Sequence, residues 1–111
     1  MVDALSEYET TLRLRPDHPA ARALLAKTHY NIAVNLGATP GRETEERSHY
    51  EEALRINPGY AEAHNNLGIL FARQGKFAEA RAHWETALRL RPDFEDARKN
   101  LQKLERLSTL R

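Results

Sequence analysis

The sequence contains no cysteine, which excludes disulfide bonds, Cys-ligated zinc and thiol chemistry. It also lacks an apolar run near the roughly 18–20 residues that span a membrane, so we expect no membrane insertion. A large excess of charge of one sign is also missing, because 17 Lys and Arg are balanced by 16 Asp and Glu, which leaves a net charge of +1. Such a balance gives no general attraction to nucleic acid or to anionic lipid. Residues 1–15 are charged throughout and lack the apolar core of a signal peptide, so we expect a cytoplasmic protein.

Residues that break helices are also scarce. The 111 residues include five Gly and five Pro, and aromatic residues make up 7% of the chain. Ala, Leu, Glu and Arg are abundant, and these residues favour helices. The composition therefore predicts an all-α protein, with enough residues for one domain of ordinary size.

Three segments share a pattern that ends in a proline: residues 4–16, 46–58 and 80–92. Each segment has an aromatic residue eight positions before the proline, Leu four positions before it, and Leu or Ile two positions before it. The prolines are 42 and then 34 residues apart. A pattern that recurs at such a period indicates an array of repeats.

Residues 61–94 resemble the tetratricopeptide repeat, a family of 34-residue helix–turn–helix units. The matching positions are His64-x-x-Leu67-Gly68-x-x-Phe71, Ala80-x-x-x-Trp84, Ala87 and Pro92, with His64 in place of the family's usual Trp. Gly68 and Ala80 are small where two helices would cross, and Leu67, Phe71, Phe77 and Trp84 would fill the space between them.

The resemblance implies an all-α superhelix, a solenoid of stacked antiparallel helix hairpins with about six helices. Residues 1–111 would form a single repeat domain. Within it we expect the second helix of a truncated repeat at 1–18, an extended repeat at 19–60, a regular repeat at 61–94, and a solvating cap helix at 95–111. The expected helices span residues 2–14, 19–36, a third segment ending at 56, then 61–73, 77–90 and 94–107, with Asp93 capping the last.

The middle repeat has eight residues more than the regular one, because its prolines are 42 residues apart. We expect both helices of this pair to be longer by about one turn. Residues 43–49 contain no apolar side chain, and Glu46 stands where the family has a small Ala. We therefore expect the tip of this hairpin to protrude and move.

No group of residues predicts catalysis. No two of the five histidines are four residues apart or form a His-Glu-x-x-His pattern, so we expect structural roles rather than a metal site. Ser6, Ser48 and Ser108 lack the strand–turn context of a nucleophile. Glu and Arg alternate at a helical spacing of four, which is typical of a solvated helix surface. We expect no enzyme activity, no cofactor and no metal.

The resemblance implies a binding surface on the first helix of each pair, which lines the concave side of such a stack. The residues expected there are Lys27, Tyr30, Asn31, Glu62, Asn65, Asn66, Ile69, Arg73, Lys99, Asn100 and Lys103, together with Ala23, Ala72 and Asp96. This set suits an extended peptide or a helix. It does not suit the family subset that binds a C-terminal carboxylate, because only Asn66 matches that subset and Asp96 would repel the ligand.

Two interpretations of function remain open. The first is a scaffold that binds a peptide or helix of a partner protein, with no nucleic acid and no membrane insertion. The second is a helical appendage of a larger enzyme or secretion or transport assembly, which contributes positioning or oligomerisation. Leu5, Tyr8 and Leu12 have no first helix to cover one side of them. We therefore expect either that the chain is a fragment of a longer repeat array or that it forms a homodimer through helix 2–14.

Overall fold

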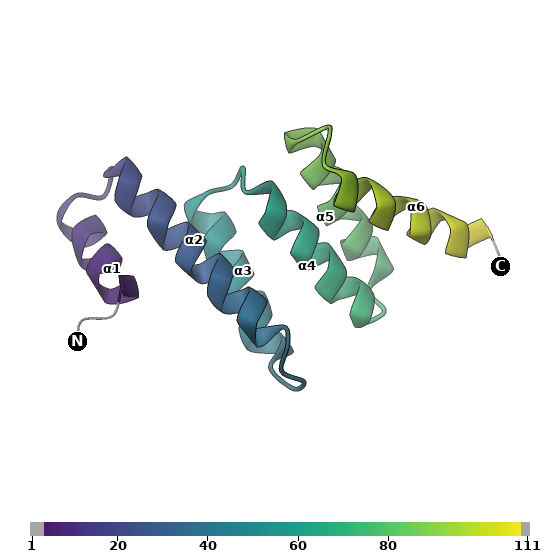
Figure 1. Cartoon of the computed structure of the whole chain (residues 1–111), viewed down its shortest axis with the longest axis horizontal. Coiled ribbons are helices and arrows are strands. Elements are labelled where there is room, and N and C mark those ends of the chain that lie inside the picture. The colour runs from purple at the N-terminus through teal and green to yellow at the C-terminus, as the bar shows by residue number, and fades with distance from the viewer. Residues whose placement is uncertain (1–3, 110–111) are drawn as a thin grey trace. The chain divides into compact units, whose positions relative to one another are not determined.

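The computed structural model describes residues 4–109, and these residues form six helices and no strand (Figure 1). About 80% of the described residues are helical. The helices are α1 (Ala4–Leu14), α2 (Pro19–Leu36), α3 (Glu43–Ile56), α4 (Ala61–Arg73), α5 (Phe77–Leu90) and α6 (Glu95–Thr109). The predicted all-α fold of six helices is therefore confirmed, while the start of the first helix at residue 2 lies outside the described residues. None of these helices is long and apolar enough to cross a membrane.

The chain divides into two compact units, Met1–Pro58 and Gly59–Arg111. In the first unit, α1 packs on α2, and α2 pairs with α3 as an antiparallel hairpin (Figure 1). In the second unit, α4 pairs with α5 in the same way and α6 packs mainly on α5. Each unit is therefore one helix hairpin with one additional helix.

Local sequence signals explain where several helices begin and end. His18 occupies the N-cap of α2, where its Nδ1 atom accepts a hydrogen bond from the Ala21 N–H at 3.1 Å. Pro19 follows at the first position, where a missing N–H costs nothing. Gly41 and Gly75 have φ angles of 89° and 76° in the turns of the two hairpins, a backbone region that favours glycine.

The paired histidines show which positions of the α2–α3 hairpin correspond to which positions of the α4–α5 hairpin. α3 and α5 both have 14 residues, and the seventh residue is a histidine in each. α2 has 18 residues and α4 has 13. Ten residues of α2 precede His29, whereas three residues of α4 precede His64. The expectation that both helices of the first hairpin are extended is therefore wrong, because only the base of α2 is longer. An insertion of seven residues is nearly two helical turns, so it keeps the same face of α2 toward the core.

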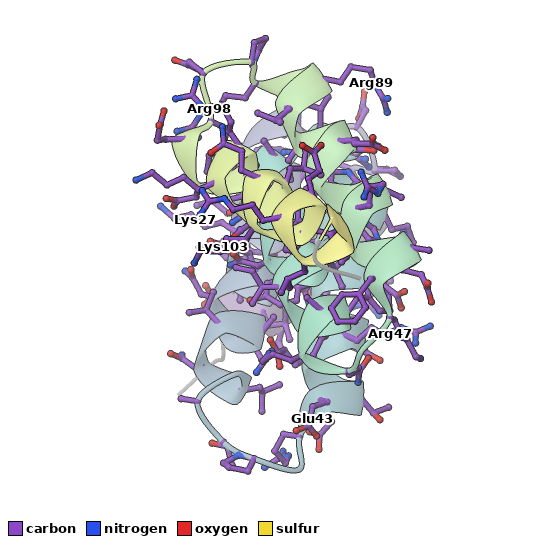
Figure 2. All side chains as sticks on the ribbon, turned by 90° about the vertical axis from the view of Figure 1, so that its right-hand side faces the viewer. Lys27, Glu43, Arg47, Arg89, Arg98 and Lys103 are labelled. Atoms are coloured by element: carbon purple, nitrogen blue, oxygen red, sulfur yellow. The ribbon has the colours of Figure 1, made fainter. Side chains whose placement is uncertain are left out.

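Glu46 occupies in α3 the place that Ala80 occupies in α5, three residues before the histidine. Both residues are buried, with 3% and 0% of their surface exposed. The longer side chain fits because Gly37 has none: a Cβ atom there would lie 3.0 Å from Oε2 of Glu46. The tip of this hairpin, marked by Glu43 in Figure 2, thus packs through a buried carboxylate side chain, and its mobility stays a prediction.

The last helix begins one residue later than expected. α6 starts at Glu95, so Phe94, not Asp93, occupies the capping position. The Asp93 carboxylate lies 3.9 Å from the Arg91 guanidinium, which itself lies over the Phe94 ring at 4.4 Å. The expected apolar stripe of α6 is present, with Leu101 half-buried and three residues buried: Phe94, Ala97 and Leu104.

Trp84 is the central contact of the second unit. Its side chain is 5% exposed, and its Nε1–H donates a hydrogen bond to the Asn65 carbonyl oxygen at 3.1 Å. A Cβ atom on Gly68 would lie 2.4 Å from Trp84 Nε1 and 2.7 Å from Cδ1. Only glycine therefore lets α4 and α5 approach this closely around the indole.

We expect Gly68→Ala to destabilise the protein by about 1–3 kcal/mol, as overpacked cores do. A change of Gly to Ala inside a helix ordinarily stabilises a protein by about 0.5–1 kcal/mol. A loss of stability would therefore indicate a clash with Trp84, and a gain would indicate that there is none. Urea unfolding measures the free energy of unfolding.

Trp84→Ala alone should lower the free energy of unfolding by about 3–5 kcal/mol. In that background Gly68→Ala should no longer destabilise, because the clashing ring is gone. Equal or higher stability of the single Gly68→Ala variant would show that Trp84 moves aside freely.

Candidate partner-binding site

The second unit contains a cleft of about 320 Å³ between α4, α5 and α6. This volume is at the lower end of the ~300–1,000 Å³ range of protein ligand sites. The residues that line it are Ile69, Ala72, Arg73, Phe77, Trp84, Asn100, Lys103, Leu104 and Leu107.

The cleft has an apolar floor and an exposed apolar rim. Trp84 and Leu104 form the floor and are 5% and 7% exposed. Ile69, Phe77 and Leu107 are large apolar residues that are nevertheless 38%, 42% and 57% exposed. The expectation that Phe77 fills the space between the two helices of the hairpin is therefore only partly right, since much of its ring faces solvent beside the cleft.

Five of the predicted binding residues meet at this cleft. Ile69 and Arg73 reach it from α4, one turn apart, and Asn100 and Lys103 reach it from α6. Ala72, which the sequence analysis also places on the binding surface, lies between them. Helical spacing alone puts each pair on one face of its own helix. That the two faces oppose each other depends on how α6 packs in this unit.

Asn65 does not belong to this surface, which corrects the prediction. It is 4% exposed, and its Oδ1 atom accepts a hydrogen bond from Asn100 Nδ2 at 3.0 Å. Its own Nδ2 group donates to Asn66 Oδ1 at 3.4 Å. The amide of Asn65 therefore links α4 to α6, because a buried polar group requires such partners.

The other predicted residues of the second unit lie outside the cleft. Glu62 forms an ion pair with Arg91 at 2.5 Å near the base of the α4–α5 hairpin. Asn66 is half-buried beside Asn65, and Lys99 is exposed on α6 but does not line the cleft.

In the first unit, Lys27 and Asn31 are exposed on α2. Tyr30 is half-buried and contacts the Tyr50 ring edge-on, with the ring centres 5.9 Å apart. A smaller hollow of about 290 Å³ lies at the base of the α2–α3 hairpin and includes Ala23 and Arg22. Arg22 also donates to the Ile56 carbonyl oxygen at 2.8 Å, which satisfies the end of α3.

The histidines form pairs that were not predicted from the sequence. His29 and His49 face each other with their Nδ1 atoms 2.9 Å apart, and His64 and His83 do so at 3.1 Å. Each pair joins the two helices of one hairpin, and the rings of the first pair are stacked with centres 5.1 Å apart. Partners separated by 19 or 20 residues cannot be found from helical spacing, although His49 and His83 each directly precede the aromatic residue of the second helix of their hairpin. Within residues 4–109, no three His, Asp or Glu side chains form a group that could hold a metal ion.

Consecutive antiparallel helix hairpins define an all-α protein of helical repeats. Two sequence models described as "Tetratricopeptide repeat" match residues 61–94 and 3–61. The second match covers more than half of the chain, so the protein belongs to the tetratricopeptide repeat family. No curated protein matches the sequence.

A solved structure titled "Crystal structure of MamA" is similar in fold, with a TM-score of 0.62 and 17% sequence identity. The match covers 96% of this chain and 78% of that one. Repeats of this family generally mediate interactions between proteins.

The burial of His29 beside His49 predicts that stability depends on pH. Burial, and then the neighbouring His49, lower the pKa of His29 below its usual 6.5, while Glu52 and Glu9 oppose the shift and Arg55 adds to it. The folded state therefore favours neutral His29. Its contribution to stability should be complete above about pH 6.5 and decrease as the pH falls below that value through the lowered pKa.

We expect the urea midpoint to be lower at pH 5.5 than at pH 7.5, and His29→Gln to reduce this difference. Hydrogen bonds from arginines lower the pKa values of Glu45, Glu52 and Glu95 below their usual 4.5. These carboxyl groups therefore contribute little to a change of stability between pH 5.5 and 7.5. A midpoint unchanged between the two pH values would contradict the assignment.

Proposed function

We propose that the protein is a scaffold that binds a peptide or helix of a partner protein and performs no catalysis. The observation that carries this proposal is the cleft of the second unit, where Ile69, Phe77 and Leu107 remain exposed around an apolar floor. Contiguous apolar surface of this kind usually marks a site of protein interaction. The general role of tetratricopeptide repeats supports the same function.

The titratable side chains support the absence of catalysis. The histidines of both hairpins are held in pairs, and Glu52, Glu62 and Glu95 form ion pairs with arginines. Such groups already have partners that stabilise the fold, rather than an open position for a substrate.

The alternative is a helical appendage of a larger assembly that positions or oligomerises other parts. α1 supports it, since Leu5, Tyr8 and Leu12 are half-buried against their own unit while Leu14 is 77% exposed. In this alternative the apolar residues of α1 associate with a second copy of the chain.

Self-association predicts that sedimentation shows a dimer at high micromolar concentration. Tyr8→Glu or Leu12→Glu should weaken it by roughly tenfold, since each buries a charge in an apolar contact. If the protein and both variants are monomers at all concentrations, self-association is excluded and the scaffold function is the remaining proposal.

The test of the scaffold compares two exposed leucines of the second unit. Leu107 lines the cleft and is 57% exposed, whereas Leu90, at the end of α5, lies outside the cleft and is 44% exposed. A photo-crosslinking residue at each position, followed by mass spectrometry, would identify what binds near each side chain in cell lysate.

The partner captured at position 107 would then be purified and its affinity measured by titration calorimetry. We expect Leu107→Glu to weaken binding at least tenfold, because a carboxylate would replace apolar contact at the rim. Leu90→Glu should change it by less than twofold. Equal effects of the two variants, or no crosslinked partner at position 107, would contradict the proposal.

A further inference from the structure

The chemistry of the cleft points to a narrower class of partner. The proposed function requires only that something bind there. The residues that line the cleft, their charges and the hydrogen bonds of the nearby amide groups narrow the class of occupant. The inference rests on the proposed function.

The charged residues that line the cleft are both cations. Arg73 reaches it from α4 and Lys103 from α6, and no carboxylate is among the lining residues that the structure describes. The acidic side chain nearest along α6, Glu105, lies 3.9 Å from Arg81 of α5. An occupant with negative charge on both sides of its apolar contact would therefore be matched by this cleft.

The near-neutral total charge conceals a difference between the two units. Residues 59–111 contain ten Lys and Arg against seven Asp and Glu, while residues 1–58 contain seven against nine. The unit that holds the cleft is thus the basic one. Its charge would speed the approach of an acidic partner and oppose a basic one.

The amide groups of the second unit argue against an extended peptide. A peptide in extended form needs hydrogen bonds to its backbone, and asparagine side chains commonly supply them. Here Asn100 donates to Asn65, and Asn65 donates to Asn66, so these amides already serve the contact between α4 and α6. A helix satisfies its own backbone and requires only apolar contact and matching charge.

The walls of the cleft also have helical spacing. Ile69, Ala72 and Arg73 follow one face of α4, and Asn100, Lys103 and Leu107 follow one face of α6. Ridges of this kind accept the side chains of a third helix laid between them.

We infer that the cleft between α4 and α6 binds an acidic amphipathic helix of a partner protein. Bulky apolar side chains of that helix enter the space above Trp84 and Leu104. Asp or Glu residues about one turn to either side pair with Arg73 and Lys103.

The test begins with a fully random library of 16-residue peptides displayed on phage and selected on the whole protein. Selection continues against Leu107→Glu, so that peptides bound elsewhere are removed. The enriched sequences should have apolar residues at i, i+3 or i+4, and i+7, with Asp or Glu beside them. A synthetic peptide of that sequence should gain helical circular dichroism on binding.

Charge reversal tests the electrostatic part. Lys103→Glu should weaken the selected peptide about tenfold, and Glu→Lys in the peptide should restore part of the loss. Arg89→Glu is the matched control, since Arg89 projects from α5 on the opposite side of the view from Lys103 in Figure 2 and does not line the cleft. That variant should stay within twofold of the wild-type protein.

Several results would overturn the inference. Enriched peptides that are basic, or that lack a helical period, would exclude an acidic helix. Binding that Leu107→Glu abolishes and Lys103→Glu leaves unchanged would exclude the pairing of charges. If the lysate partner binds at position 107 but its segment is neither acidic nor helical, this inference fails while the scaffold function stands. If no partner and no peptide binds, both fail.

Discussion

The contact of Trp84 with Gly68 and with the Asn65 carbonyl determines most of the second unit. The indole is wedged against α4 at a distance that leaves no room for a Cβ atom on Gly68, and its N–H is bonded to α4 as well. One side of the ring thereby fixes the spacing of the hairpin, and another forms the floor of the cleft. Stability and the binding surface thus depend on the same side chain.

The hydrogen bonds of Asn65 extend this constraint to α6. Its backbone carbonyl holds Trp84 and its side chain holds Asn100, so a single residue of α4 contacts both other helices. A buried, fully bonded amide favours one arrangement, because any shift of α6 would leave polar atoms without partners. The cleft is therefore formed before a ligand arrives, which reduces the entropy lost on binding.

Much of the fold could be predicted from the sequence because its signals are local. Pro19 marks the start of α2, and the small residues Gly68 and Ala80 predict that α4 and α5 cross closely. The wrong expectations concern contacts between distant segments. The length of the middle repeat shows that eight residues are added but not where they lie, and the pairing of His29 with His49 shows that seven of them lie at the base of α2.

The predictions for the candidate site also depend on whether the contact is local or joins distant segments. Ile69, Arg73, Asn100 and Lys103 were predicted from the family's geometry, and the structure brings them together. Asn65 looked equivalent to its neighbours in sequence, yet it is buried, because the partner that buries it lies 35 residues away. Phe77 and Leu107 were not predicted as lining residues, since apolar residues in an amphipathic repeat are ordinarily assigned to the core.

α6 shows why the cleft is more than a by-product of capping the hairpin. A helix that only shields the core needs one apolar stripe and polar residues elsewhere. The stripe of α6 serves that purpose with Phe94, Ala97 and Leu104 buried. Leu107 continues the line of Lys103 one turn further and lines the cleft, yet it is 57% exposed. Together with the exposed side chains of Ile69 and Phe77 it forms the apolar rim of the cleft, and contiguous apolar surface of this kind is typical of a site that contacts a partner.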